Sequence, residues 1–187
     1  MSIITHKQLF FYLFIGLFNM ACSASDTSSS LWEHLPYESQ LDGSKGVKAE
    51  FVKETHKKTL YMTNSQTSKY NWCSIISPEE GWDLNESAFI EAQFTNVGDS
   101  EIELLFWVHA NKGWDAVASS ATLIPGESQT LSCNLWEAFP DGTPKINPSC
   151  IDKIQFMLVN AKADAKLVVG GLKAKGIAKP FQAPKED

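Results

Sequence analysis

Residues Gly81–Leu135 have the sequence GWDLNESAFIEAQFTNVGDSEIELLFWVHANKGWDAVASSATLIPGESQTLSCNL, and this stretch decides the fold. Three runs within it alternate apolar with polar side chains: Phe89–Thr95, Ile102–Ala110 and Thr130–Leu135. Because successive side chains of a strand point to opposite faces, each run predicts an antiparallel strand with one buried face. The segments 96–99 (NVGD) and 125–128 (PGES) contain the residues that tight turns require. The stretch therefore predicts the middle of a β-sandwich.

The flanking sequence predicts further short strands and no helix. These strands are Val47–Lys53, Thr59–Thr63, Tyr70–Ser77, Ile151–Asn160 and Leu167–Lys175. Eight or nine short strands separated by turns are typical of an all-β, antiparallel β-sandwich or jelly roll. With 187 residues, 43% of them hydrophobic, the chain can form one such domain with a substantial core. We place the domain at residues 31–176. It begins with an entry segment, 31–44, that has no clear period, and a mobile tail, 177–187, follows it.

The N-terminus has the features of an export signal, which we assign to residues 1–21. Lys7 precedes an apolar run, Leu9–Phe18, that is too short to span a bilayer. The Ala21-Cys22 junction resembles a bacterial lipoprotein cleavage site, so Cys22 is the expected lipidation site and residues 22–30 the flexible tether. Asn19 stands where that pattern prefers Leu, which leaves cleavage after Ala24 as the alternative. We expect an envelope lipoprotein at the outer membrane or cell surface, with a periplasmic or secreted protein as the alternative.

The charge of the chain restricts its partners. Without residues 1–21 it carries 15 Lys and no Arg against 22 Asp and Glu, a net charge of −7. Nucleic acid attracts basic surfaces, and Arg is the preferred side chain for phosphate. The composition therefore argues against nucleic acid and favours a neutral partner. We expect membrane contact through the lipid anchor only, and a monomer.

Three cysteines remain beyond Cys22, namely Cys73, Cys133 and Cys150. Export permits a disulfide, and a Cys133–Cys150 bridge would close the long connection between two predicted strands. In the alternative, all three are reduced and act as small hydrophobic side chains.

The central stretch resembles a known family. The phrases WDLNESAFIEAQFTNVGDSEIELLFWV, GW and SATLIPGESQTLSCNL resemble the β-sandwich that precedes the catalytic barrel in family 50 glycoside hydrolases, the β-agarases. They also look like the wider group of galactose-binding-like jelly rolls, and the resemblance covers Val47 to Gly176. It implies a jelly roll and a polysaccharide partner. Gly170-Gly171 stand where related domains have acidic residues that help to hold a structural calcium, so we predict no cofactor.

No catalytic pattern is present in the sequence. The histidines His34, His56 and His109 lie on separate elements, and the chain is too short to contain the agarase barrel. Glycoside hydrolysis needs two nearby carboxylates. Sequence leaves open a pair among the following residues: Glu91, Glu103, Asp115 and Glu137. Acids on exposed strand faces usually serve solubility, so we predict that the protein is not an enzyme.

Tryptophans offer a different chemistry, because an aromatic plane can stack on the apolar face of a sugar. Trp107 and His109 lie on the face opposite the predicted core, and Trp114 lies in a turn between Asn111 and Asp115. These five residues are the candidate carbohydrate-binding site. The other tryptophans have plainer expectations: Trp82 in the core, Trp136 covering one end of the core, and Trp72 either buried or exposed. The sequence thus favours non-catalytic binding of a neutral, galactan- or agarose-like polysaccharide, with a structural or protein-interaction domain as the alternative.

Overall fold

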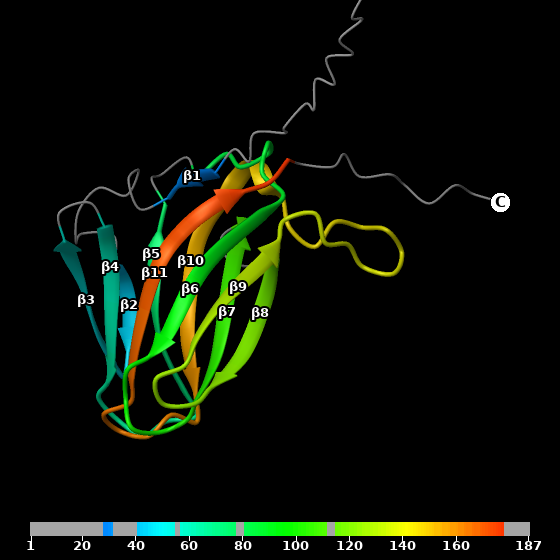
Figure 1. Cartoon of the computed structure of the whole chain (residues 1–187). Helices are drawn as coiled ribbons and strands as arrows, with labels where there is room; N and C mark the ends of the chain where they lie inside the picture. Colours follow the sequence, from blue (N-terminus) through cyan, green and yellow to red (C-terminus); the bar gives the residue numbers. More distant parts are fainter. Residues whose placement is uncertain (1–27, 32–40, 55–56, 78–80, 112–114, 178–187) are drawn as a thin grey trace, which may run out of the picture.

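The computed structural model describes residues 28–31, 41–54, 57–77, 81–111 and 115–177. They form a sandwich of two antiparallel sheets (Figure 1). The strands are β1 (Ser28–Ser30), β2 (Leu41–Lys45), β3 (Val47–Glu54), β4 (Lys57–Asn64), β5 (Tyr70–Ile76), β6 (Phe89–Asn96), β7 (Ile102–Ala110), β8 (Asp115–Leu123), β9 (Ser128–Asn134), β10 (Ile151–Val159) and β11 (Lys166–Lys175). No helix long and apolar enough to cross a membrane occurs in these ranges.

The two sheets have different strand orders. One has five strands in the order β2-β5-β10-β7-β8. The other has six, in the order β3-β4-β11-β6-β9, with β1 paired to β11 in addition. Apart from the consecutive pairs β3-β4 and β7-β8, neighbouring strands come from distant parts of the sequence, and the chain crosses repeatedly between the layers. The prediction of an all-β jelly-roll sandwich is confirmed.

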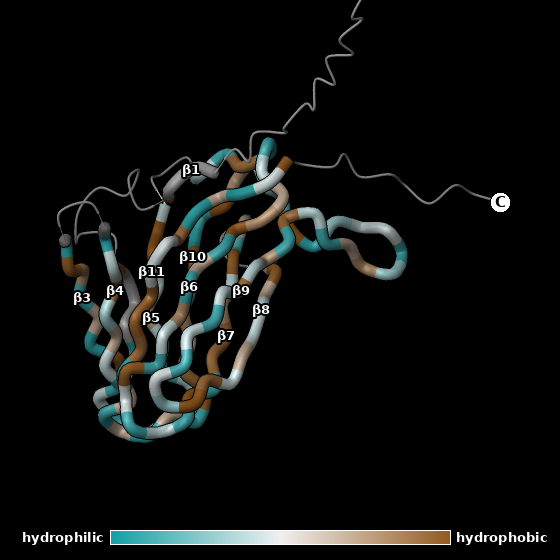
Figure 2. Tube along the Cα trace, in the orientation of Figure 1, coloured by the Kyte–Doolittle hydropathy of each residue, from teal (hydrophilic) through white to brown (hydrophobic). Residues whose placement is uncertain are grey.

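The alternation read from the sequence produces the core. On β7, Ile102, Leu104, Phe106 and Val108 are fully buried between the sheets, whereas Glu103 is exposed on the other face. The same two-residue period runs along β6 and, with a shift at Gly170-Gly171, along β11 (Figure 2). At the centre, three phenylalanines pack together from β6, β7 and β10. The ring centroids of Phe94 and Phe106 are 5.4 Å apart, and Phe156 lies 5.8 Å from Phe106.

Three strands were not predicted from the sequence. Ser28–Ser30 pair with β11, so the last three residues of the expected flexible tether are in a strand. Leu41–Lys45 lie within the expected aperiodic entry segment and pair irregularly with β5, with a register shift between Asp42 and Lys45. Strand β8, Asp115–Leu123, is built largely from Ala and Ser, whose small contrast in polarity hides the alternation. Residues 1–27 and 178–187, which include Cys22 and most of the tail, lie outside the described residues.

One glycine fixes the crossing from the five-stranded to the six-stranded sheet. Gly46 separates β2 from β3 and has a φ of 67°, which side chains rarely adopt. A Cβ on Gly46 would lie 2.1 Å from the Oδ1 atom of Asn71. Asn71 is fully buried and donates from Nδ2 to the Gln66 carbonyl. The site therefore requires glycine for both its backbone angle and its space.

The predicted Cys133–Cys150 disulfide is absent. Cys133 points into the core from β9 and donates to the Phe106 carbonyl at 3.3 Å. Cys150 sits at the end of the 3-10 turn Pro148–Cys150, and its Sγ atom lies 3.2 Å from Oδ1 of Asn111. Cys73, Cys133 and Cys150 are all free thiols. The two sulfurs therefore have different surroundings. In the sequence, the hairpin 136–147 separates the two cysteines.

Candidate functional site

The outer face of the five-stranded sheet is the surface opposite the core. Alternate residues of four strands build it, beginning with Tyr70 on β5, Lys153 on β10, Glu103 on β7 and Ala116 on β8. Residues of β5, β10, β7 and β8 stay directly opposite one another along almost the whole sheet, because the register of these pairs shifts only near Ile151. Side chains that are far apart in the sequence therefore stand in rows across the sheet.

Two neighbouring rows contain the tryptophans. In one row, Trp107 on β7 is opposite Gln155 on β10, which is opposite Ser74 on β5. In the next row, Trp72 on β5 is opposite Met157 on β10. Two strand spacings across and two residues along put the Cα atoms of Trp72 and Trp107 roughly 12 Å apart. The tryptophans thus stand diagonally across the middle strand.

Gln155 and Met157 of β10 lie between these tryptophans, and both have little access to solvent. Gln155 is only 8% exposed although it faces outward, and Ser74 is also buried. Gln155 donates from Nε2 to Oγ of Ser74 at 3.2 Å. Trp72 and Trp107 are half-buried. The face therefore offers two aromatic planes beside an amide and a hydroxyl, a set that can stack on a flat apolar surface and hydrogen-bond its polar rim.

Small residues keep one flank of this face open. Ala118 on β8 is opposite Trp107, and Ser120 is opposite Leu105. Neither side chain is large enough to cover the Trp107 ring. On the other flank, the Lys45 ammonium lies 5.2 Å from the centroid of the Trp72 ring. This cation–π contact holds Trp72 at the β2 edge of the face.

His109 was expected to be an exposed contact on this face, and that expectation is wrong. Its side chain is on the outer face but only 4% exposed. Its ring lies against the Trp107 ring with centroids 5.4 Å apart and an interplanar angle of 69°. Lys153 is opposite His109 on β10. His109 therefore supports Trp107 from the side instead of presenting its own surface.

The predicted loop site is separate from the outer face. Asn111 donates from Nδ2 to the carboxylate of Asp115, and Cys150 lies against Oδ1 of Asn111. Asn111 and Asp115 therefore lie together. Asp115 is three residues along β8 from Ala118, roughly 10 Å from the Trp107 row. Trp114, the third member of this predicted set, lies outside the described residues.

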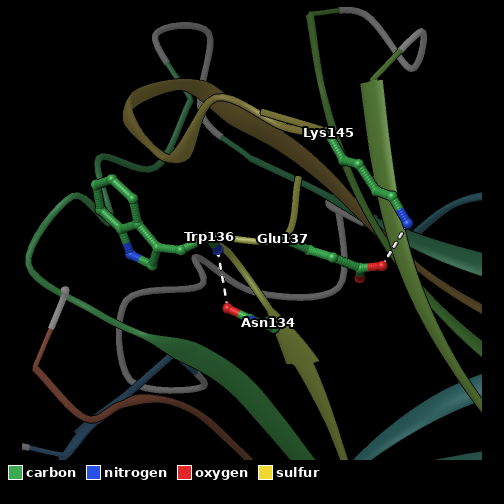
Figure 3. Close-up of polar contacts among 4 residues, drawn as sticks. All are labelled: Asn134, Trp136, Glu137 and Lys145. Atoms are coloured by element: carbon green, nitrogen blue, oxygen red, sulfur yellow. Dashed lines mark hydrogen bonds and ion pairs between the residues drawn. The ribbon is translucent and has the colours of Figure 1, made fainter. Parts of the chain in front are cut away.

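The remaining described tryptophans have structural positions. Trp82 is buried, as the sequence predicted, and its backbone pairs with Ile151. Trp136 packs against the core and donates from Nε1 to the Ser87 carbonyl at 2.8 Å. Its backbone N–H also donates to Asn134 (Figure 3). A small pocket of about 160 Å³ beside Trp136 is lined mainly by apolar atoms, so it offers few hydrogen-bonding groups to a polar ligand.

Among the four carboxylates that could have formed a catalytic pair, Glu103 is separated from both Glu91 and Asp115. Glu91 faces outward from the six-stranded sheet, where it accepts from Ser132, whereas Glu103 faces outward from the five-stranded sheet. Asp115 is at the opposite end of β8 from the partner of Glu103, roughly 23 Å away. Glu137 forms an ion pair with Lys145 (Figure 3). No group of three or more metal-binding side chains occurs in the described part of the chain.

Three residues of the face were missed by sequence reasoning: Ser74, Gln155 and Met157. The sequence does mark Gln155 as unusual, because it is a polar side chain inside the apolar run IDKIQFMLV. Its place beside Trp107 depends on strands β5, β10 and β7 being neighbours, and local periodicity does not contain that information.

Comparison with known proteins supports the fold. No protein-family model matches the chain, and no curated protein matches its sequence. The structure is similar to that of an exo-β-agarase, with a TM-score of 0.62 and 17% identity, over 85% of this chain and 28% of the agarase. A second agarase has a TM-score of 0.57 and 12% identity, over 80% of this chain and 24% of that one.

A mutant of a carbohydrate-binding module of family 29 is also similar, with a TM-score of 0.52 and 13% identity. The match covers 85% of this chain and 99% of that module. This chain therefore spans about a quarter of each agarase but nearly a whole module. It has the β-sandwich fold of carbohydrate-binding modules and is similar to the domains of family 50 agarases, as the sequence resemblance implied.

Proposed function

We propose that this protein binds a polysaccharide on the outer face of its five-stranded sheet, without catalysis. The observation that carries the proposal is the diagonal pair Trp72 and Trp107 with the buried Gln155–Ser74 hydrogen bond beside them. Sugar rings have an apolar face and a rim of hydroxyls, which match the aromatic planes and the amide–hydroxyl pair. A structure of a family 29 module in complex with cellulohexaose shares this fold, with a TM-score of 0.52 and 12% identity.

The expected ligand is a neutral glycan, with agarose or another galactan as the first choice. The chain has no Arg and a net charge of −6, so a polyanion would be repelled by the molecule as a whole. The resemblance to agarase domains supports galactans in particular. The separation of the acidic residues supports a binding role in place of hydrolysis.

The first test is a pull-down of residues 23–187 with insoluble agarose, cellulose, mannan and xylan. We expect retention on at least one neutral polysaccharide, agarose first. Stacking and neutral hydrogen bonds are short-range, so we expect retention to change little between low and high salt. Retention only on polyanions, lost on addition of salt, would contradict the proposal and favour a protein- or charge-recognition role.

We further propose that the chain is anchored to the cell envelope through a lipid on Cys22. The proposal rests on the apolar run that ends at Ala21-Cys22 and on the polar residues that follow. The expressed wild-type protein should partition into the detergent phase, and Cys22→Ala should move it to the aqueous phase or block its maturation. Ser23→Ala is the matched control and should still partition with detergent. Mature wild-type protein that starts at Ser25 would contradict the anchor and support ordinary export.

A further inference from the structure

Strand β8 leaves one edge of the five-stranded sheet open. It pairs with β7 along all nine of its residues, and none of the strands in the described part of the chain is hydrogen-bonded to its other side. Its core-facing residues Ser119 and Ala121 are half-exposed, whereas the corresponding residues Leu104 and Phe106 of β7 are fully buried. The outward edge of β8 is therefore accessible to another strand.

This edge lacks the features that usually prevent strand addition. Proteins protect free edges with charges, prolines or irregular pairing. On the far side of the sandwich, β3 carries four charged residues and β2 carries two, with a register shift. Residues 116–122 of β8 (AVASSAT) contain no charge, no proline and no glycine. Because each chain is acidic overall, an uncharged edge is where two copies can approach with least repulsion.

Exposed apolar side chains lie at both ends of the same edge. Ile124 follows β8 and is 57% exposed, and Val97, in the neighbouring turn, is 48% exposed. The Gly126 N–H donates to the Asn96 carbonyl, which ties these two turns together. At the other end, Phe139 is 50% exposed on the hairpin 136–147. Figure 1 shows this hairpin in yellow, projecting beyond the side of the sandwich formed by β8 and β9.

The hairpin is braced, so it presents Phe139 in a defined position. The Phe139 N–H donates to the Thr143 carbonyl, and the Lys145 N–H donates to the Glu137 carbonyl. The ion pair between Lys145 and Glu137 joins its two arms (Figure 3). The Lys145 ammonium also lies 5.7 Å from the Phe139 ring centroid. Such bracing lowers the entropy lost when an exposed side chain enters an interface.

We propose that β8 is the interface at which two copies of this chain pair edge to edge, antiparallel, about a two-fold axis near Ser119. Because β9 returns from the turn after β8, the hairpin lies at the Asp115 end of β8 and Ile124 lies at the other end. Antiparallel pairing over the full strand brings the hairpin of each copy beside Ile124 and Val97 of its partner. An isologous interface requires this self-complementarity.

The pairing joins the two five-stranded sheets into one continuous sheet of ten strands. The outer faces of the two copies then become contiguous across Ala118 and Ser120, the small residues that flank Trp107. The proposal departs from the monomer expected from the sequence. It stands independently of glycan binding, which it would extend by presenting two sites side by side.

Sedimentation velocity of the soluble chain, residues 23–187, tests the pairing. We expect a dimer at micromolar concentration, and dissociation constants raised about tenfold or more by Ile124→Asp and by Phe139→Ser, because exposed apolar anchors dominate such interfaces. Val52→Asp, at an exposed apolar residue of β3 on the opposite edge, is the matched control and should leave the dimer intact. A wild-type monomer throughout, or equal loss of dimer in the Val52 variant, would overturn the proposal.

Hydrogen exchange locates the interface in the same samples. Amides of β8 that point away from β7 should exchange more slowly as protein concentration rises, and this protection should be lost in Ile124→Asp. Amides at the free edge of β3 should not depend on concentration. A dimer whose β8 amides exchange at the same rate as in the monomer would overturn the assignment to β8.

Discussion

Phe106→Ala should lower the free energy of unfolding by about 3–5 kcal/mol, the range for removal of a fully buried phenylalanine. Phe106 is completely inaccessible and lies at the centre of the aromatic cluster. Its ring is 5.4 Å from that of Phe94 on the opposite sheet and is stacked 5.8 Å from that of Phe156 on the neighbouring strand. The substitution therefore leaves a cavity at the point where the two sheets meet, and strands on both sides cannot relax to fill it.

Urea denaturation followed by tryptophan fluorescence measures this change. Phe89→Ala is the matched control, because Phe89 is on β6 but 37% exposed on the outer side of the six-stranded sheet. We expect that control to change the unfolding free energy by about 1 kcal/mol or less. Equal losses in the two variants would contradict the placement of the core between the sheets at Phe106.

Alkaline pH should destabilise the protein through two buried thiols. Burial raises the pKa of Cys73 to about 12. The same effect raises the pKa of Cys133 to about 12, with a hydrogen bond from the Ser119 backbone acting in the opposite direction. Both thiols have an ordinary pKa of 9.0 in the unfolded chain. Above pH 9 the unfolded chain loses these protons while the folded protein keeps them, so stability is complete below pH 9 and falls as the pH rises toward 12.

Each thiol should lower the free energy of unfolding by about 1.4 kcal/mol per pH unit over this window, or by about 2 kcal/mol in total at pH 10.5. Urea unfolding at several pH values from 8 to about 10.5 measures the slope. The double variant Cys73→Ala, Cys133→Ala should start less stable but lose less on alkalinisation, whereas Cys150→Ala should keep the wild-type slope. A double variant with an unchanged slope would show that other groups cause the alkaline loss.

The sequence predicted most core strands of the two sheets well, and predicted the residues that are exposed on the surface less well. Strand β7 was predicted at its observed limits because Ile102, Leu104, Phe106 and Val108 alternate with more polar residues. Strand β8 was missed because alanine and serine differ too little in polarity for a period to appear. The Cys133–Cys150 bridge was wrong for a related reason. Sequence spacing showed that the two cysteines end and begin strands, but it did not show that Cys133 faces the core.

The candidate site was recovered only in part. Trp107 was placed on the outer face by the alternation of β7, which depends on one strand alone. Gln155 and Ser74 became its neighbours through the order β5-β10-β7, which joins segments about 80 and 50 residues apart in sequence. The burial of His109 was missed as well, because the alternation of β7 shows which face the side chain is on and not how much of it is exposed. Long-range pairing, and not local pattern, therefore determines which outward residues are accessible.

Isothermal titration calorimetry with oligosaccharides of the glycan that retains the protein tests the central claim most directly. Trp107→Ala should lose about 1–3 kcal/mol of binding free energy, the range for loss of a stacked aromatic ring. Tyr61→Ala is the matched control, since Tyr61 is an exposed aromatic residue on the outer face of the other sheet. We predict wild-type affinity for the Tyr61 variant. Wild-type affinity for Trp107→Ala together with loss of binding in Tyr61→Ala would contradict the assignment of the site to the five-stranded sheet.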